Sequence, residues 1–297
     1  MDWKKSRESD NVVEDEGGGG VGSGGGGFQF GGFHLGLGGL ALIVVVSLLL
    51  GKNPIEILSL LSGDGGSAPT EAVPARGAER PSTETDDQHR FVRAILGSTE
   101  DVWDAYFQDA GKRYQRPTLK LFDGRVNTAC GAASEAAGPF YCPGDRLVYL
   151  DLSFFREMET RFHAAGDFAR AYVIAHEVGH HVQNLLGTTA KLDAARRRGA
   201  PLEGADGLSV RLELQADCYA GVWGNRSQAK LDWINQRDVD AALGAASAIG
   251  DDTLQKQARG YVVPDSFTHG SSAQRVRWFK TGLSSGDVDS CDTFARR

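Results

Sequence analysis

Apolar residues recur every three to four positions over much of the chain beyond residue 90. The segment 91–111 (FVRAILGSTEDVWDAYFQDAG) places these side chains at helical spacing: Val92, Ile95, Val102, Trp103 and Tyr106. Because Gly97 interrupts this pattern, we expect two helices here, with folded sequence beginning near Arg90. Residues 118–122 and 147–152 (LVYLDL) are typical of short β-strands, separated by a loop rich in Gly and Cys.

Two longer helices are predicted further on. The first runs from Asp167 to Gly187, with Asp167 suited to the N-cap and Gly187 to the C-cap. The second, which contains SVRLELQADCYAGVW, is bounded by Asp206 and Gly224. The pattern therefore predicts an α+β domain over residues 90–297, mainly helical with a small β-sheet.

The first third of the chain has a different pattern. Residues 33–51 (FHLGLGGLALIVVVSLLLG) are uncharged and long enough for one transmembrane helix. The Gly-rich residues 1–32 predict a disordered N-terminus, and residues 52–89, rich in Gly, Ser, Pro and charge, predict a flexible linker.

The basic residues before and after residues 33–51 predict the orientation of the chain. Lys4, Lys5 and Arg7 precede this segment and Lys52 follows it, which favours a cytoplasmic N-terminus. We expect a single-pass protein of the cell inner membrane, with its folded domain periplasmic or extracellular. A cleaved signal peptide is the alternative. In a signal peptide the basic residues directly precede the apolar core, whereas Lys4, Lys5 and Arg7 lie well ahead of it here. A cytosolic protein with an amphitropic N-terminus is a third.

Charge excludes one class of partner. The chain of 297 residues has a formal net charge of −7. This balance argues against nucleic-acid binding, because such proteins carry a broad basic surface.

The helix of residues 167–187 contains the sequence His176-Glu177-Val178-Gly179-His180, an HExxH pattern. At about 100° per residue, His176 and His180 lie one turn apart on one face, so both imidazoles can bind one ion. Glu177 lies beside them and can act as a general base towards a water molecule. A chance match on a buried helix is the alternative.

The next helix adds carboxylates. Glu213 and Asp217 share one face at a spacing of four residues, and most of their neighbours are apolar. Glu213 suits a third zinc ligand, and Asp217 can accept a hydrogen bond from a ligating histidine. A solvated pair of carboxylates is the alternative.

These motifs carry a family resemblance. AHEVGHHVQ, followed by ELQADCYAGVW, resembles the gluzincin metallopeptidases and, in detail, the bacterial membrane-anchored family called putative neutral zinc metallopeptidases. The resemblance covers nearly the whole chain, including CGAASEAAGPFYCPGDRLVYLDLSFF and FTHGSSAQRVRWFKTG. It implies a zincin-like domain and peptide hydrolysis, with ligands His176, His180 and Glu213 and base Glu177.

Three other residues near these motifs have candidate roles. His269 or Tyr261 can donate to the oxyanion that develops during hydrolysis, and a capping or loop-tethering role is the alternative for His269. His181 lies about 100° round the helix from His180, so a peripheral hydrogen bond is expected instead of ligation. Residues 147–152 are either a sheet edge that holds an extended substrate or an ordinary core strand.

Four cysteines allow three disulfide connectivities. Cys130 and Cys142 are close in sequence, which favours a local bridge and leaves Cys218 to pair with Cys291. Disulfides require an oxidising compartment.

Taken together, the sequence predicts a metalloendopeptidase of the HExxH type. It would use one Zn²⁺ ion to hydrolyse a peptide or protein substrate. The alternative is a catalytically silent, zinc-stabilised binding or scaffold module at the membrane.

Overall fold

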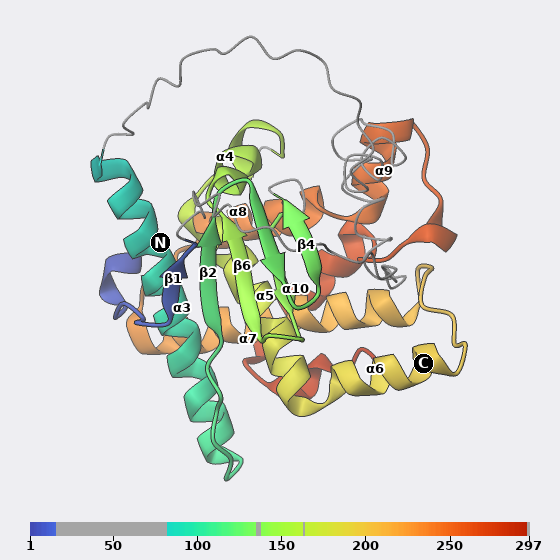
Figure 1. Cartoon of the computed structure of the whole chain (residues 1–297), viewed down its shortest axis with the longest axis horizontal. Helices are drawn as coiled ribbons and strands as arrows, with labels where there is room; N and C mark the ends of the chain where they lie inside the picture. Colours follow the sequence, from blue (N-terminus) through green and yellow to red (C-terminus); the bar gives the residue numbers. More distant parts are fainter. Residues whose placement is uncertain (16–81, 135–137, 163, 296–297) are drawn as a thin grey trace, which may run out of the picture.

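The computed structural model describes residues 1–15, 82–134, 138–162 and 164–295. The strands of this part are β1 (Val12–Glu14), β2 (Thr118–Phe122), β3 (Arg125–Thr128), β4 (Gly131–Ser134), β5 (Phe140–Cys142) and β6 (Leu147–Asp151). The helices are α3 (Ser82–Asp109), α4 (Ser153–Thr160), α5 (Asp167–Leu186), α6 (Thr188–Arg197), α7 (Leu208–Leu231), α8 (Gln236–Ala248), α9 (Asp251–Arg259) and α10 (Ser272–Ser285). Short 3₁₀ helices are η1 (Trp3–Lys5), η3 (Pro264–Ser266) and η4 (Val288–Cys291). The α+β prediction, mainly helical with a small sheet, is confirmed (Figure 1).

The main sheet has the strand order β1-β2-β6-β5. Strands β1, β2 and β6 run parallel, whereas β5 pairs antiparallel with β6. Leu119 of β2 and Val148 of β6 are paired in register and fully buried, so the centre of the sheet faces the core. Strands β3 and β4 form a separate antiparallel pair.

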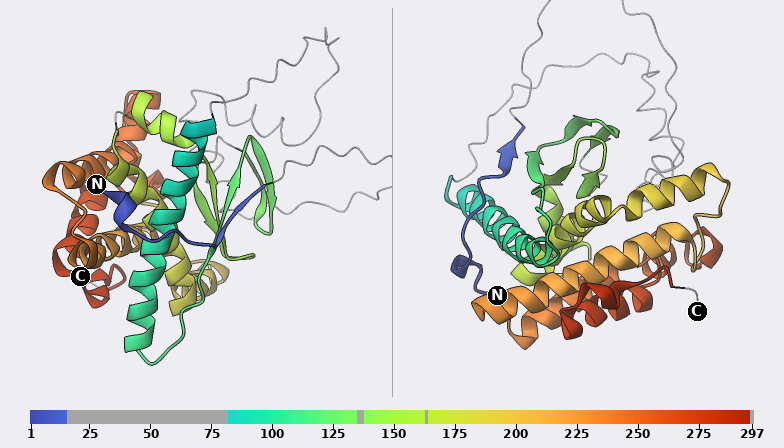
Figure 2. Two further views of the ribbon diagram at one scale, coloured as in Figure 1. Left: turned by 90° about the vertical axis from the view of Figure 1, so that its left-hand side faces the viewer. Right: turned by 90° about the horizontal axis from the view of Figure 1, so that it is seen from below.

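Helix α5 lies at the centre of the helical part and is buried on most of its surface. It packs against α3, α7 and α8, and against β5. Figure 2 shows the sheet on one side of α5 and the long helix α7 on the other, with α10 packed against α7. Because α5 and α7 carry the HExxH and ELQAD motifs, this arrangement brings the two motifs together.

Residues 1–15 pack against the folded domain. Val12 is 4% exposed and pairs with Leu119, which extends the sheet by one strand. Glu100 of α3, fully buried, accepts hydrogen bonds from the side chains of Arg7, Ser9 and Asn11, each at 2.6 Å. A buried carboxylate is costly unless it is paired, so these bonds hold the segment in place.

The prediction that residues 1–32 form a disordered cytoplasmic segment is therefore wrong for residues 1–15. Residue patterning missed this because β1 is three residues long and its partners lie more than 80 positions away. Helix α3 also begins at Ser82, inside the predicted linker 52–89. Its start contacts the same segment, since His89 lies 3.0 Å from Glu14.

This packing corrects the predicted location. One membrane crossing between residues 15 and 82 would place residues 1–15 and 82–295 on opposite sides, whereas the structure packs them together. The single-pass inner-membrane protein with a periplasmic or extracellular domain is thus contradicted. The helix predicted at residues 33–51 lies outside the described residues. Among the helices that are described, none combines the length and apolar character needed to span a bilayer.

Two predicted helix boundaries also change. Helix α3 is continuous through Gly97, because at this position the backbone of Arg7 crosses the helix: a Cβ atom on Gly97 would lie 2.4 Å from the Arg7 carbonyl oxygen. Helix α5 has Gly166, not Asp167, as its N-cap, and its C-cap is Gly187, as predicted. Both predicted disulfides are present, Cys130–Cys142 and Cys218–Cys291.

Candidate metal centre

Helices α5 and α7 approach each other closely at the two histidines. Gly179, between His176 and His180, faces α7, where a Cβ atom would lie 3.1 Å from the carbonyl oxygen of Ala216. A larger residue would push α7 away. The glycine of the HExxH motif therefore keeps Glu213, three residues before Ala216, within reach of the histidines.

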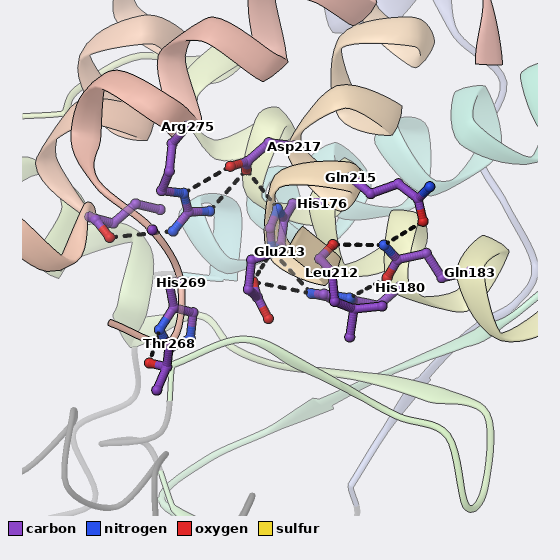
Figure 3. A network of polar contacts seen from close by, with 12 residues as sticks. His176, His180, Gln183, Leu212, Glu213, Gln215, Asp217, Thr268, His269 and Arg275 are labelled. Atoms are coloured by element: carbon purple, nitrogen blue, oxygen red, sulfur yellow. Dashed lines mark hydrogen bonds and ion pairs between the residues drawn. The ribbon is translucent and has the colours of Figure 1, made fainter. Parts of the chain in front are cut away.

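Three side chains converge at this contact (Figure 3). Glu213 Oε2 lies 3.2 Å from His176 Nε2 and 3.5 Å from His180 Nε2. The two Nε2 atoms are 3.2 Å apart. The structure thus brings together the three residues that the sequence predicted as metal ligands, and these three can hold a metal ion.

Hydrogen bonds on the far side of each imidazole assign its protons. His176 Nδ1 lies 2.8 Å from Asp217 Oδ1, and His180 Nδ1 lies 2.8 Å from Gln183 Oε1. Both partners are acceptors, so each Nδ1 carries a hydrogen and donates it. In the neutral imidazoles, both Nε2 atoms then present lone pairs toward the carboxylate of Glu213. Three acceptors that face one another require a cation between them.

The spacing fits zinc. Four ligands at 2.0–2.1 Å in a tetrahedron are about 3.3 Å from one another. The three distances of 3.2–3.5 Å match the edges of such a tetrahedron. Two imidazoles and one carboxylate are a common donor set for zinc, and catalytic zinc sites of this kind leave a fourth position to water or substrate.

In the metal-free protein, a proton on His176 supplies positive charge in place of a metal ion. Burial alone would lower the pKa of His176, but the Asp217 and Glu213 carboxylates outweigh it and raise that pKa to about 10. Burial would likewise raise the pKa of Glu213, yet the histidines hold it well below its usual value. A metal ion must therefore displace protons from this site, which makes its binding dependent on pH.

A buried network supports Asp217. Arg275 of α10 donates to both carboxylate oxygens of Asp217 at 2.9 Å, and the Tyr172 hydroxyl donates to Oδ1 at 2.5 Å. Burial would raise the pKa of Asp217, but Arg275 and His176 lower it to about 2. Asp217 is thus a buried anion that accepts a hydrogen bond from His176 Nδ1.

Glu177 is also buried, with 7% of its surface exposed. Burial raises the pKa of its carboxyl group, partly offset by His176 and His180 and reinforced by Glu213. A raised pKa suits a carboxylate that takes a proton and later returns it.

His269 lies next to Glu213, on the side away from His180 in Figure 3. Asp251 fixes its loop, because Asp251 Oδ2 accepts the backbone N–H groups of Thr268, His269 and Gly270 at 2.7–3.0 Å. Burial lowers the pKa of His269, but Glu213 and Asp251 together raise it above its usual value. Tyr261, the other predicted oxyanion donor, is 60% exposed.

The match to a known family agrees with this geometry. Residues 1–294 match the model of the family described as "Putative neutral zinc metallopeptidase". The chain belongs to this family. The match includes residues 1–15, which the structure packs against the domain.

The chain is similar to two relatives over most of the length of each. The chain is 46% identical to the uncharacterized protein YpfJ of Escherichia coli (strain K12), over all of this chain and 99% of the relative. It is 43% identical to the uncharacterized protein Rv2575 of Mycobacterium tuberculosis (strain ATCC 25618 / H37Rv), over 84% and 85% of the two chains. No solved structure matches the chain significantly.

Several residues of this family member's site were not predicted. Tyr172 precedes His176 by four residues and Gln183 follows His180 by three, so helical spacing alone could have placed them on the metal-binding face. Arg275 has no such signal, since it lies nearly 60 positions beyond Asp217 and resembles any helical arginine.

Proposed function

We propose that the protein is a zinc-dependent metalloendopeptidase of the zincin type, acting on peptide or protein substrates. The observation that supports this most strongly is the convergence of three acceptor atoms at tetrahedral distances, with the protons of both imidazoles directed away. Family membership agrees with it. Zinc bound there would supply Lewis acidity, which lowers the pKa of water and polarises a carbonyl group.

The protein's own residues would handle the protons. Glu177 accepts a proton from the attacking water at a carboxylate oxygen and returns it to the nitrogen of the leaving amine. His269, whose backbone N–H group donates to Asp251, would stabilise negative charge on the scissile carbonyl oxygen. We assign that role to His269 instead of Tyr261, whose side chain is largely in water.

The sheet offers one edge for an extended substrate. Strand β6, which includes most of residues 147–152, pairs with β2 on one side and β5 on the other, so it is a core strand and cannot accept a further strand. Within the described sheet, β5 is the edge that packs against α5. We propose that the substrate backbone pairs along β5.

Substituting Glu177→Gln tests the mechanism. Removing the proton acceptor should lower kcat/KM for an unfolded protein such as casein by at least about 100-fold. Bound zinc, measured by atomic emission, should stay at one ion per chain, because Glu177 is not a ligand. Glu159→Gln, which neutralises an exposed carboxylate that pairs with Arg170, should leave both unchanged.

Other outcomes separate the alternatives. Zinc binding by the wild-type chain without chelator-sensitive cleavage of any test protein would indicate the silent scaffold module. Undiminished cleavage by the Glu177→Gln variant would remove Glu177 from the mechanism.

A further inference from the structure

We propose that Gln183 and Gln215 are positioning residues for His180, and that the Cys218–Cys291 disulfide anchors them. The inference rests on the proposed metal site. It concerns how the protein holds one ligand, and it can be tested without measuring hydrolysis.

Gln183 has only one possible orientation. Its side chain is fully buried, and its Nε2 atom lies 2.7 Å from the carbonyl oxygen of Leu212, which can only accept a hydrogen bond. The amide nitrogen must therefore point to α7 and the amide oxygen to His180. This oxygen fixes the hydrogen on His180 Nδ1 and leaves Nε2 directed at the metal position.

Gln215 continues the connection. Its Oε1 accepts a second hydrogen bond from Gln183 Nε2 at 3.1 Å, and its own Nε2 donates to the carbonyl oxygen of Cys291 at 3.1 Å. The Cys291 carbonyl can only accept, so it orients Gln215 in turn. Three hydrogen bonds thus link His180 to Cys291 at the end of η4 (Figure 3 shows the first two).

The disulfide fixes the end of this relay, the hydrogen-bonded series His180–Gln183–Gln215–Cys291. Cys291 lies in η4 and is bonded to Cys218, three residues after Gln215 on α7. Both cysteines are fully buried. Arg211 and Thr293 add a second attachment, because Thr293 Oγ1 donates to the Arg211 carbonyl oxygen at 2.6 Å. Loss of the disulfide should therefore loosen the relay without abolishing it.

The two ligand histidines are held differently. A carboxylate, Asp217, orients His176, whereas a neutral amide orients His180. Asp217 lies beside Cys218 on α7, so α7 supports both ligands, one through charge and the other through the relay. The support of His176 reaches α10 through Arg275, whereas the support of His180 reaches Cys291 in η4 through Gln183 and Gln215.

The test compares three Gln→Met substitutions, which conserve side-chain size, with removal of the disulfide, all in the full chain. Gln183→Met removes the hydrogen bond to His180 and the one to Gln215. Gln215→Met keeps the hydrogen bond to His180 and removes those from Gln215 to Gln183 and Cys291. A Cys218→Ala/Cys291→Ala double variant removes the disulfide. Gln255→Met is the control, since Gln255 is also a buried amide but binds Val263 and Ser266 instead. Zinc affinity is measured by competition with a chromophoric chelator, and stability by urea unfolding.

We expect Gln183→Met to raise the zinc Kd by about 10- to 100-fold. The Gln215→Met and double-alanine variants should raise it less, in that order, while Gln255→Met lowers stability and leaves the Kd unchanged. A Kd that follows stability across all four variants would overturn the proposal.

A second measurement keeps the proposal independent of the proposed function. In metal-free protein, the Nδ1–H proton of His180 should be protected from exchange by NMR, and Gln183→Met should remove that protection. Persistent protection in the variant would also overturn the inference. If wild type neither binds zinc nor cleaves peptides, the proposed function fails, yet this proton still reports whether Gln183 positions His180.

Discussion

His180 and His181 are adjacent in sequence but have opposite electrostatic surroundings. His180 faces Glu213, whereas His181 projects from a neighbouring face of α5, where its Nε2 atom lies 2.5 Å from the Gln115 carbonyl oxygen and its Nδ1 atom 3.1 Å from the Tyr141 hydroxyl of β5. These contacts bear out the predicted peripheral hydrogen bonds. Burial lowers the pKa of His181 to about 4, so it is neutral in the folded protein.

This neutral histidine makes stability depend on pH. The folded pKa lies below the unfolded value of 6.5, so the contribution to stability is complete above pH 6.5 and is lost as the pH falls towards 4. A shift of this size corresponds to roughly 3 kcal/mol. His181→Gln keeps a donor for Gln115 and does not titrate.

Urea unfolding of both proteins between pH 7 and pH 4 measures the difference. We expect the wild-type chain to lose stability relative to His181→Gln over this interval. The titrations of His176 and His180 are common to both proteins and cancel. Parallel stability curves would show that His181 is not held neutral.

At the scale of elements, glycines set the crossing of α7 and α10. A Cβ atom on Gly282 would lie 1.9 Å from the Cys218 carbonyl oxygen, and one on Gly221 would lie 2.2 Å from the Phe279 carbonyl oxygen. The helices therefore touch backbone to backbone. This close crossing is what lets Arg275, two turns before Gly282, reach Asp217.

Gly282→Ala should force the two helices apart. We expect a loss of about 1–3 kcal/mol in the free energy of unfolding, together with weaker zinc binding, because Arg275 withdraws from Asp217. Gly244→Ala in α8 is the control: its Cβ would meet no atom within 4 Å, so it should stabilise the protein by about 0.5–1 kcal/mol. Urea midpoints and zinc titrations of both variants check this. Equal effects of Gly282→Ala and Gly244→Ala on stability and zinc binding would contradict a close contact between α7 and α10 at Gly282.

The sequence predicted what is local to an element and missed what depends on distant partners. Periodicity predicted α5 and the core of α7, and spacing placed His176, His180 and Glu213 on faces that meet. Gly97 was misread as a helix break, since the backbone of Arg7 that requires a glycine there is 90 positions away. Arg275 was missed for the same reason.

At the scale of the whole molecule, residues 1–15 are the least predictable feature. They contain few apolar residues, and composition favours disorder. Their stability comes from polar groups that complement α3: Glu100 is fully buried and bonded to Arg7, while Arg7 also binds Asp101 at 2.7 Å. A sequence pattern records hydrophobic faces and carries no information on such pairs.

A double-mutant cycle can test whether the N-terminal segment packs against the domain. Arg7→Met and Glu100→Gln should each destabilise the chain, and their coupling energy should be about 1–3 kcal/mol, because the hydrogen-bonded carboxylate is fully buried. The pair of Glu8 and Arg90 also joins the segment to α3, but both side chains are substantially exposed. Its coupling should stay below about 0.5 kcal/mol. Urea unfolding of the seven proteins, with the wild type shared by the two cycles, gives both values. A coupling near zero for Arg7 and Glu100 would mean that residues 1–15 do not pack on α3, and the argument against a single membrane crossing would lose its support.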